Sequence, residues 1–405
     1  MKISIIGEGP FVATGFSTVG RQLAKGFSRL GHDVNFLSFQ HFGEILTVFD
    51  NDYDFKTTFG NLKNGYKLYP CDKSEFGINT FIPFLKKTKP DILITYFDLW
   101  SKPMAFLVDN NISKYYKWIH YASIDSSPIP ASLYNNISAP QVLLSMSKYG
   151  QSEFKKYNYS TDFIWLGVDT KLFIPRPELK LTSQYNGKFV VLFASRNNLR
   201  KEPEKFLRAI KIISKKYPDK YKNMVFHMHT DMNDLEGLPL LDIIRQLGIQ
   251  DKVFKTANYN DVFDPLNRED LAKLYSLANI HVLPTGAEGF GLTIAETMAC
   301  GIPTVMTNCS TGPELLHNEV GVSGRLAKVK EKIVGAIGSY LCLVDANDLA
   351  ENIMFYYDNE NERKRHGMNG RIFTERYLDW DDCIIPKWLK MFDTDNYRQP
   401  MVEIT

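Results

Sequence analysis

The chain has 405 residues, of which 44% are hydrophobic and 23% are charged, a composition that excludes an intrinsically disordered protein. At about 150 residues per domain, this length corresponds to two or three domains and excludes a single small module. Lys and Arg number 48 against 46 Asp and Glu, with the two signs interspersed, so the overall charge predicts no nucleic-acid partner.

The N-terminus and the cysteines both favour a soluble, cytoplasmic protein. Residues 1–7 enter a strand-like apolar run without a signal-peptide core or cleavage site. The apolar runs have the length of strands, far short of the roughly 20 residues that cross a bilayer, so we predict no transmembrane segment, while peripheral membrane contact stays open. The cysteines are odd in number and lack a Cys-x-x-Cys pair, which argues against a disulfide or zinc framework. They are Cys71, Cys300, Cys309, Cys342 and Cys383.

Short β-branched or aromatic runs alternate with helical stretches along the whole chain, which is typical of parallel sheets built from βαβ units. These runs lack strict alternation, as expected for strands that are covered on both faces. In the first half we predict strands at residues 2–6, 33–39, 91–96, 118–121, 141–146 and 162–166. In the second half we predict strands at residues 189–194, 224–229, 252–255, 280–283, 304–306 and 340–344. The predicted fold class is α/β, with two sheets of similar size.

Residues 167–188 interrupt this pattern with two prolines, two glycines and few apolar residues, which is typical of a linker. We therefore predict two Rossmann-like domains with mainly parallel sheets that face a central cleft. The predicted bounds are 1–170 for the first domain, 171–187 for the linker and 188–383 for the second domain, with a C-terminal helix at about 384–405 that packs back on the first. Ligands of such sheets bind outside the carboxyl ends of the strands, so functional residues are expected in loops that face the cleft.

A glycine-rich loop, Gly7 to Gly15, joins the first strand to a helix predicted to begin near Phe16. The loop resembles a dinucleotide fingerprint but is not G-x-G-x-x-G, and the second strand ends in Gln40 and His41 without the acidic residue that binds the ribose of NAD. Hydride transfer is therefore disfavoured.

The most informative stretch is residues 280–305, which predicts a buried strand, a glycine-rich turn and a helix that begins near Leu292 and ends before Gly301. Glu288 lies in the turn and Glu296 in the first turns of the helix, so both carboxylates can flank one helix N-terminus. Peptide N–H groups between them can bind a diphosphate, and a carboxylate suits the vicinal hydroxyls of a ribose or a transferred sugar. The N–H groups belong to Gly289, Phe290, Gly291, Leu292 and Thr293. The alternative is two acids that merely favour a helix N-terminus.

This stretch resembles the E-x7-E signature of the retaining glycosyltransferases of family four, which implies the GT-B fold. Arg196 and Lys201 are similar to that family's G-R-x4-K element, in which the two cations neutralise the donor diphosphate, although Ser195 and Glu202 stand where glycines are common. The alternative for the two cations is a solvated basic loop. The resemblance is strong from about residue 160 to 380, with further matches at residues 166–173, 321–326 and 345–350, and looser before residue 160.

The resemblance also implies roles for three residues of the first half. In similar proteins the glycine-rich loop after the first strand reaches the donor phosphates and the acceptor, which makes Thr14 and Gly15 candidates. Family members commonly carry a histidine at the position of His120 that contacts the transferred sugar. The alternative for His120 is a structural histidine of the core.

Two further groups of residues contain possible metal ligands. His227, His229 and Asp231 lie close together in sequence, but no convincing further ligand follows them, so packing is favoured. Asp379 and Asp381 have the D-x-D form of metal-dependent sugar transferases, yet they precede the last helix, and turn formation or capping explains them better. We therefore predict no metal site.

These observations predict a metal-independent glycosyltransferase with no cofactor besides the nucleotide sugar substrate. The resemblance further implies a retaining reaction with Glu288 and His120 at the reaction centre. The base is expected to lie near residues 255–259, with UDP and GDP both open, and the acceptor can be a glycan, a lipid, a small molecule or a protein. The alternatives are a nucleotide-sugar 2-epimerase of the same fold and a catalytically silent sugar-nucleotide-binding subunit.

Overall fold

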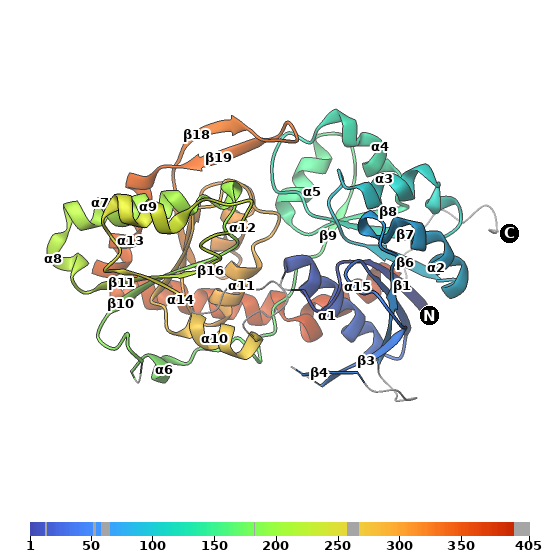
Figure 1. Ribbon diagram of the computed structural model, residues 1–405, viewed down its shortest axis with the longest axis horizontal. Helices are drawn as coiled ribbons and strands as arrows, with labels where there is room; N and C mark the ends of the chain where they lie inside the picture. The colour runs from blue at the N-terminus through green and yellow to red at the C-terminus, as the bar shows by residue number, and fades with distance from the viewer. Residues whose placement is uncertain (13, 52–53, 58–64, 182, 257–266, 393–405) are drawn as a thin grey trace. The chain divides into compact units, whose positions relative to one another are not determined.

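The computed structural model describes residues 1–12, 14–51, 54–57, 65–181, 183–256 and 267–392 (Figure 1). The chain divides into two compact units. Unit 1 comprises residues Met1–Ile124, Ile129–Gly167 and Trp380–Thr405, and unit 2 comprises Asp125–Pro128 and Val168–Asp379. The predicted linker, residues 171–187, is grouped with unit 2, and the chain returns to unit 1 at Trp380, shortly before the predicted residue 384.

Unit 1 contains a nine-stranded sheet in the order β4-β3-β5-β2-β1-β6-β7-β8-β9. The pairs from β5 to β9 are parallel, whereas β3 pairs antiparallel with both β5 and β4. The strands are β1 (Lys2–Gly7), β2 (Asp33–Ser38), β3 (Leu46–Asn51), β4 (Asp54–Thr57), β5 (Tyr66–Pro70), β6 (Ile92–Thr95), β7 (Lys117–Ala122), β8 (Val142–Ser145) and β9 (Asp162–Phe163). The sequence predicted six of them and missed β3, β4 and β5, so the two sheets are not of similar size.

Helices cover both faces of this sheet (Figure 1). They are α1 (Gly15–Arg29), α2 (Phe81–Thr88), α3 (Lys102–Asp109), α4 (Tyr134–Ser138), α5 (Lys148–Lys155) and α15 (Ile385–Phe392). The fully buried indole of Trp388 in α15 stands edge-on to Phe27 of α1 and to Tyr121 of β7, with ring centroids 6.1 and 5.0 Å apart. The last described helix is thereby part of the core of unit 1.

Unit 2 contains a six-stranded, fully parallel sheet in the order β12-β11-β10-β13-β14-β17. The strands are β10 (Phe189–Ala194), β11 (Met224–His229), β12 (Val253–Lys255), β13 (Ile280–Leu283), β14 (Thr304–Thr307) and β17 (Gly324–Ala327). The α/β fold class with mainly parallel sheets is thus confirmed. One strand was assigned to the wrong sheet: residues 340–344 form β19 (Tyr340–Val344), which pairs antiparallel with β18 (Val329–Val334) in a separate hairpin.

Two helical layers sandwich the sheet of unit 2. Helices α7, α9 and α13 share one apolar core with β10 and β11, in which Phe193, Phe206 and Ile353 are fully buried. Helices α10, α11 and α14 lie together on the other side of the sheet (Figure 1). The helices are α6 (Pro177–Leu181), α7 (Pro203–Lys216), α8 (Pro218–Tyr221), α9 (Leu240–Leu247), α10 (Arg268–Ser276), α11 (Leu292–Ala299), α12 (Gly312–Leu316), α13 (Ala346–Asp358) and α14 (Glu360–Phe373).

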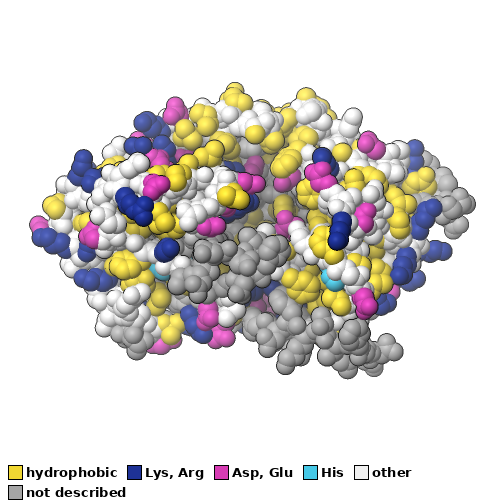
Figure 2. Space-filling model, in the orientation of Figure 1, with side chains coloured by type: hydrophobic (Ala, Val, Ile, Leu, Met, Phe, Trp, Pro, Cys, Tyr) yellow, Lys and Arg dark blue, Asp and Glu magenta, His cyan; other side chains and the backbone are white. Residues whose placement is uncertain are grey.

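The surface carries charged side chains of both signs, which lie interspersed over the face that Figure 2 shows. None of the helices in the described part of the chain is long and apolar enough to cross a membrane.

Candidate active site

Two loops at the carboxyl ends of neighbouring strands in unit 2 are tied to each other. The loop after β10 contains a short helical turn, Leu199–Lys201, capped by the side chain of Asn198, which accepts a hydrogen bond of 3.1 Å from the N–H of Lys201. The carbonyl of Arg200 accepts a hydrogen bond of 2.7 Å from the N–H of Gly286, in the loop after β13. This backbone contact fixes the cations of the first loop against the second.

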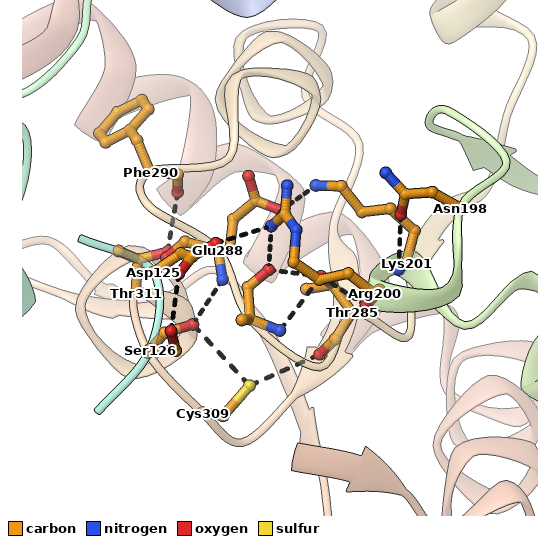
Figure 3. Close-up of polar contacts among 12 residues, drawn as sticks. Asp125, Ser126, Asn198, Arg200, Lys201, Thr285, Glu288, Phe290, Cys309 and Thr311 are labelled. Atoms are coloured by element: carbon orange, nitrogen blue, oxygen red, sulfur yellow. Dashed lines mark hydrogen bonds and ion pairs between the residues drawn. The ribbon is translucent and has the colours of Figure 1, made fainter. Parts of the chain in front are cut away.

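The loop after β13, residues 284–291, is held in turn by the loop after β14 (Figure 3). The N–H of Glu288 donates to the hydroxyl of Ser310 over 2.9 Å, and the hydroxyl of Thr311 donates to the carbonyl of Phe290 over 2.9 Å. Gly291 then caps α11 with a φ of 103°, a left-handed conformation that glycine adopts without the steric penalty of a side chain. Glu288 is therefore presented on a rigid turn immediately before a helix.

The side chains from these loops form a cluster of alternating charge, with Lys201 in an ion pair with Glu288 (Figure 3). The guanidinium of Arg200 lies 3.8 Å from the carboxylate of Glu288 and 3.6 Å from that of Asp125, and it also donates to the carbonyl of Ala287. Asp125 belongs to the short segment counted with unit 2, where the carbonyl of Ser127 accepts from the N–H of Tyr340 over 2.9 Å.

The cluster shifts the pKa values of its own members. Burial raises the pKa of Glu288, but the positive charges of Lys201 and Arg200 outweigh it, so the pKa lies below its usual value. Burial lowers the pKa of Lys201 against the opposing effect of Glu288. The side chains of Lys201 and Glu288 each keep only 12% exposure, whereas that of Arg200 keeps 32%. An anionic ligand could replace Glu288 as the partner of both cations.

Arg196, the first cation suggested by the resemblance, does not contact this cluster in the structure. Its guanidinium bonds to Asp234 and Glu236 in the loop after β11, with distances of 2.8 Å to each carboxylate, and its side chain is 57% exposed. Arg200 contacts Glu288 in its place, and it is not among the residues predicted from the sequence. Its position next to Lys201 in the same loop was the available signal.

The other residues of the E-x7-E stretch have different degrees of burial. Glu296 is buried in α11, where it accepts from the hydroxyl of Tyr275 over 3.2 Å and lies 3.6 Å from the guanidinium of Arg268. Its carboxylate thus joins α10 to α11. Gly289, Phe290 and Gly291 are buried, and Leu292 and Thr293 are half-buried in the first turn of α11. Peptide N–H groups of a first helical turn have no intrahelical partner.

In unit 1, Thr14 and Gly15 lie at the N-terminus of α1. The hydroxyl of Thr14 accepts a hydrogen bond of 3.1 Å from the N–H of Ser17 and donates to the carboxylate of Glu8, so it caps the helix. Gly15 is the first residue of α1. Their contact with donor phosphates stays a prediction.

His120 differs from the expectation. It is fully buried in β7, where its Nδ1 lies 2.8 Å from the hydroxyl of Thr95, which also accepts from the indole of Trp118 over 2.8 Å. Burial lowers the pKa of His120 to about 3, so the imidazole is neutral. These contacts place the ring in the core of unit 1, not at its surface, because the strand is covered on both faces.

The remaining candidates have structural partners. The ring of His227 lies 2.8 Å from the hydroxyl of Tyr185, and both His227 and His229 lie 3.0 Å from the hydroxyl of Thr256. Asp379 accepts from the hydroxyl of Thr170 over 2.5 Å. Within the described residues, no three His, Cys, Asp or Glu side chains are grouped as a metal site. Of the stretch predicted to bind the base, residues 257–259 lie outside the described residues.

Comparisons with known proteins agree with this geometry. Residues 178–373, within unit 2, match the family described as Glycosyl transferases group 1. A D-inositol 3-phosphate glycosyltransferase of Paenarthrobacter aurescens is 32% identical over 35% of this chain and 33% of its own length. An O-antigen chain mannosyltransferase B of Escherichia coli is 27% identical over 52% of this chain and 53% of its own. The chain thus spans a third to a half of these two curated relatives.

Solved structures share the fold over nearly the whole chain. A sucrose-phosphate synthase of Thermosynechococcus elongatus superimposes with a TM-score of 0.74 at 16% identity, covering 96% of this chain and 98% of the other. HepE of Anabaena, in complex with UDP and glucose, gives a TM-score of 0.68 at 17% identity and covers 96% and 99%. The chain therefore has the GT-B fold, and residues 178–373 are similar to the group 1 glycosyltransferases.

Proposed function

We propose that the protein transfers a hexosyl group from a nucleoside diphosphate sugar to an acceptor hydroxyl, with retention of the anomeric configuration and without a bound metal ion. The observation that carries the proposal is the ion pair of Lys201 with Glu288, beside Arg200, at the carboxyl ends of β10 and β13. Open parallel sheets bind ligands at this edge. The match of residues 178–373 to a family of sugar-transferring enzymes supports the same conclusion.

Departure of the nucleoside diphosphate creates negative charge that the site must stabilise. In the proposed mechanism, Lys201 and Arg200 turn from Glu288 to the phosphates when the donor binds. The peptide N–H groups at the start of α11 add positive dipoles to the same region. These groups supply the charge for which other sugar transferases use a divalent cation, so we propose that transfer needs none.

Glu288, released from the two cations, accepts hydrogen bonds from hydroxyls of the transferred sugar and orients it. The bond between the anomeric carbon and the phosphate oxygen breaks, and the acceptor oxygen bonds to that carbon on the same face. The departing phosphate oxygen takes the proton of the acceptor hydroxyl. Glu288 positions the sugar in this scheme and does not attack it.

UDP-hexoses are the first donors to test, because HepE shares the fold and its structure contains UDP and glucose. GDP-hexoses form the second set. D-inositol 3-phosphate, which the name of one relative specifies, is the first acceptor to test, followed by glycans, lipids and proteins. A donor that binds the folded chain raises its melting temperature, so a thermal-shift screen of both sets identifies it.

The variant Glu288→Gln tests the proposal. It removes the charge with little change in volume, and we expect kcat to fall at least 100-fold, the size typical of a lost electrostatic contact in a transition state. The affinity for the free nucleoside diphosphate should stay within about threefold, because the cations remain. Glu269→Gln, a carboxylate on the exposed face of α10 that pairs with Lys273, serves as the matched control.

Turnover of Glu288→Gln at the wild-type rate would overturn the assignment. Product analysis separates the alternatives: an epimerase converts the donor without an acceptor, and a silent subunit binds it without any turnover. Rates in the presence and absence of EDTA test the metal independence.

A further inference from the structure

Two cysteines that are far apart in sequence lie against the loop that carries Glu288. The sulfur of Cys309, in the loop after β14, is 3.5 Å from the carbonyl oxygen of Thr285 (Figure 3). The N–H of Cys342, in β19, donates to the carbonyl of the next residue, Gly286, over 2.9 Å. A Cβ on Gly286 would lie 3.1 Å from the carbonyl oxygen of Cys342, so the strand and the loop are in close contact.

The two thiols also interact directly. A hydrogen bond with Cys309 and the charge of Lys332 lower the pKa of Cys342, although burial opposes them. The same hydrogen bond, together with burial, raises the pKa of Cys309. Burial, assisted by the negative charges of Asp72 and Glu296, raises the pKa of Cys71 to about 11 and that of Cys300 to about 12. The lowered pKa of Cys342 favours its thiolate, the form that reacts with oxidants.

A short chain of contacts leads from this pair to the proposed reaction centre. Ser310 follows Cys309, and its hydroxyl lies 3.8 Å from the sulfur of Cys309. The same hydroxyl accepts the N–H of Glu288 over 2.9 Å. Any displacement of Cys309 therefore changes the support of the Glu288 backbone.

We propose that Cys309 and Cys342 are a modification site that hydrogen peroxide converts to a disulfide, and that this disulfide reversibly lowers the transfer activity. The effect on activity rests on the proposed function, whereas the formation of the disulfide does not. Each of the two residues keeps 9% exposure, which suits a small oxidant better than a bulky one.

Formation of the disulfide by hydrogen peroxide takes two steps. The thiolate of Cys342 attacks one peroxide oxygen, the O–O bond breaks, and a sulfenic acid and hydroxide form. The thiol of Cys309 then attacks the sulfenic sulfur, an S–S bond forms, and water leaves. Two thiols have been oxidised by two electrons, and one peroxide has been reduced to two water molecules.

An S–S bond of about 2.0 Å is shorter than any contact between two thiols, so its formation draws Cys309 and β19 together. Ser310 moves with Cys309, and the hydrogen bond to Glu288 is weakened or lost. A reductant restores the two thiols and with them this support.

Peptide mapping without reductant tests the chemistry on the full chain. After peroxide treatment we expect a Cys309–Cys342 cross-link and the loss of two of the five free thiols, both reversed by dithiothreitol. In the Cys342→Ser variant, Cys309 should keep its free thiol after peroxide treatment. Cys309→Ser should leave a sulfenic acid at Cys342 that dimedone labels. Cys300→Ser, a buried cysteine outside the pair, is the control and should cross-link like the wild type.

Activity is the second measurement. Peroxide should lower the transfer rate of the wild type and of Cys300→Ser at least fivefold, and dithiothreitol should restore it. The transfer rates of Cys309→Ala and Cys342→Ala should be the same with and without peroxide. Oxidation of Cys383 or Cys71 without a Cys309–Cys342 cross-link would overturn the proposal, as would equal peroxide sensitivity in Cys342→Ala. If no preparation transfers a sugar, the proposed function fails, and the mapping still decides whether the disulfide forms.

Discussion

The first strand-to-helix connection of each unit ends in a helix N-terminus, but the two connections carry opposite charges. In unit 1, the connection from β1 to α1 contains Glu8, whose carboxylate accepts from the hydroxyl of Thr14 at the helix start. In unit 2, the connection from β10 to α7 contains Arg196, Arg200 and Lys201. A negative group thus already occupies the helix start of unit 1, whereas unit 2 gathers cations.

Both connections also contain a glutamate, which is half-buried in unit 1 and buried in unit 2, and its partners differ. Burial raises the pKa of Glu8 at the start of α1. Glu202, which follows Lys201, accepts a hydrogen bond of 3.2 Å from the N–H of Val344 in β19. The acid of unit 2 is thus removed from the cation cluster, which leaves Lys201 and Arg200 to Glu288 and to an anionic ligand. The difference agrees with the proposal that unit 2 binds the diphosphate.

Lys201→Ala is expected to have the largest effect on this contrast. It removes the buried cation that pairs with Glu288 and leaves Arg200 as the remaining cation beside that carboxylate. Loss of one preorganised group at a developing charge lowers the rate by about 10²- to 10³-fold. We expect a loss of this size in kcat/KM for the donor, together with weaker binding of free UDP in a calorimetric titration.

Arg208→Ala is the control for Lys201→Ala, because it removes a cation that pairs with Glu204 on the exposed face of α7. It should change kcat/KM less than twofold. Equal kcat/KM values for Lys201→Ala and Arg208→Ala would show that the cations of this connection do not bind the donor.

Glu202→Gln tests, through the stability of the protein, whether the buried glutamate of unit 2 is protonated in the folded state. Burial raises the pKa of Glu202 from 4.5 to about 8. The unfolded chain ionises this group above pH 4.5 while the folded chain keeps it protonated, so the folded state loses stability as the pH rises from 4.5 to 8. At 1.36 kcal/mol per pKa unit, the loss is on the order of 3 kcal/mol by pH 7.

Glutamine cannot ionise, so Glu202→Gln should lack this slope. Urea unfolding between pH 4.5 and 8 should show a stability difference in favour of the variant that grows with pH and then levels off. Glu204→Gln, a carboxylate of α7 paired with Arg208, is the control. Parallel stability curves for Glu202→Gln and the wild type would mean that Glu202 is ionised in the folded protein.

The sequence predicted the buried parallel strands well and the others poorly. Residues 224–229 and 280–283 were assigned with the bounds that the structure has, because they are apolar runs covered on both faces. The strands β3 to β5 were missed, since residues 46–70 are rich in Asp, Asn, Lys and Gly and β3 pairs antiparallel. The assignment of residues 340–344 to the main sheet failed because sequence does not specify which strand pairs with which.

For the site, the sequence placed Lys201 and Glu288 in loops at strand ends, and the structure brings their side chains together. It gave no indication that Arg196 bonds to Asp234, because that contact joins residues 38 positions apart. The helical turn Leu199–Lys201 decides which of the neighbouring cations points to Glu288, and this turn was not predicted. Loop conformation and long-range ion pairs were therefore the missing information.

Asp234→Asn tests whether Arg196 can act as a third cation for the diphosphate. Hydrogen bonding to Arg196 lowers the pKa of Asp234, so the pair is ionised at neutral pH and the arginine is engaged. Loss of this partner leaves Glu236 to compete with UDP for Arg196, and we expect UDP to bind about threefold more tightly.

Arg196→Ala should bind UDP about tenfold more weakly, roughly 1.4 kcal/mol. Asp231→Asn, in the same loop, is the control. Weaker binding by Asp234→Asn would exclude Arg196 as a ligand of the donor.

Thr14→Ala, at the start of α1 in unit 1, should give the smallest effect. The hydroxyl of Thr14 is engaged by the N–H of Ser17 and by Glu8, so its loss removes an N-cap worth about 1 kcal/mol. The melting temperature should fall by about 2–4 °C, while the affinity for UDP stays within twofold. Ser152→Ala, an exposed hydroxyl of α5, should change neither. A tenfold loss of UDP affinity in Thr14→Ala would instead show that this connection reaches the donor, as the family resemblance implies, and that the charge contrast does not confine the diphosphate to unit 2.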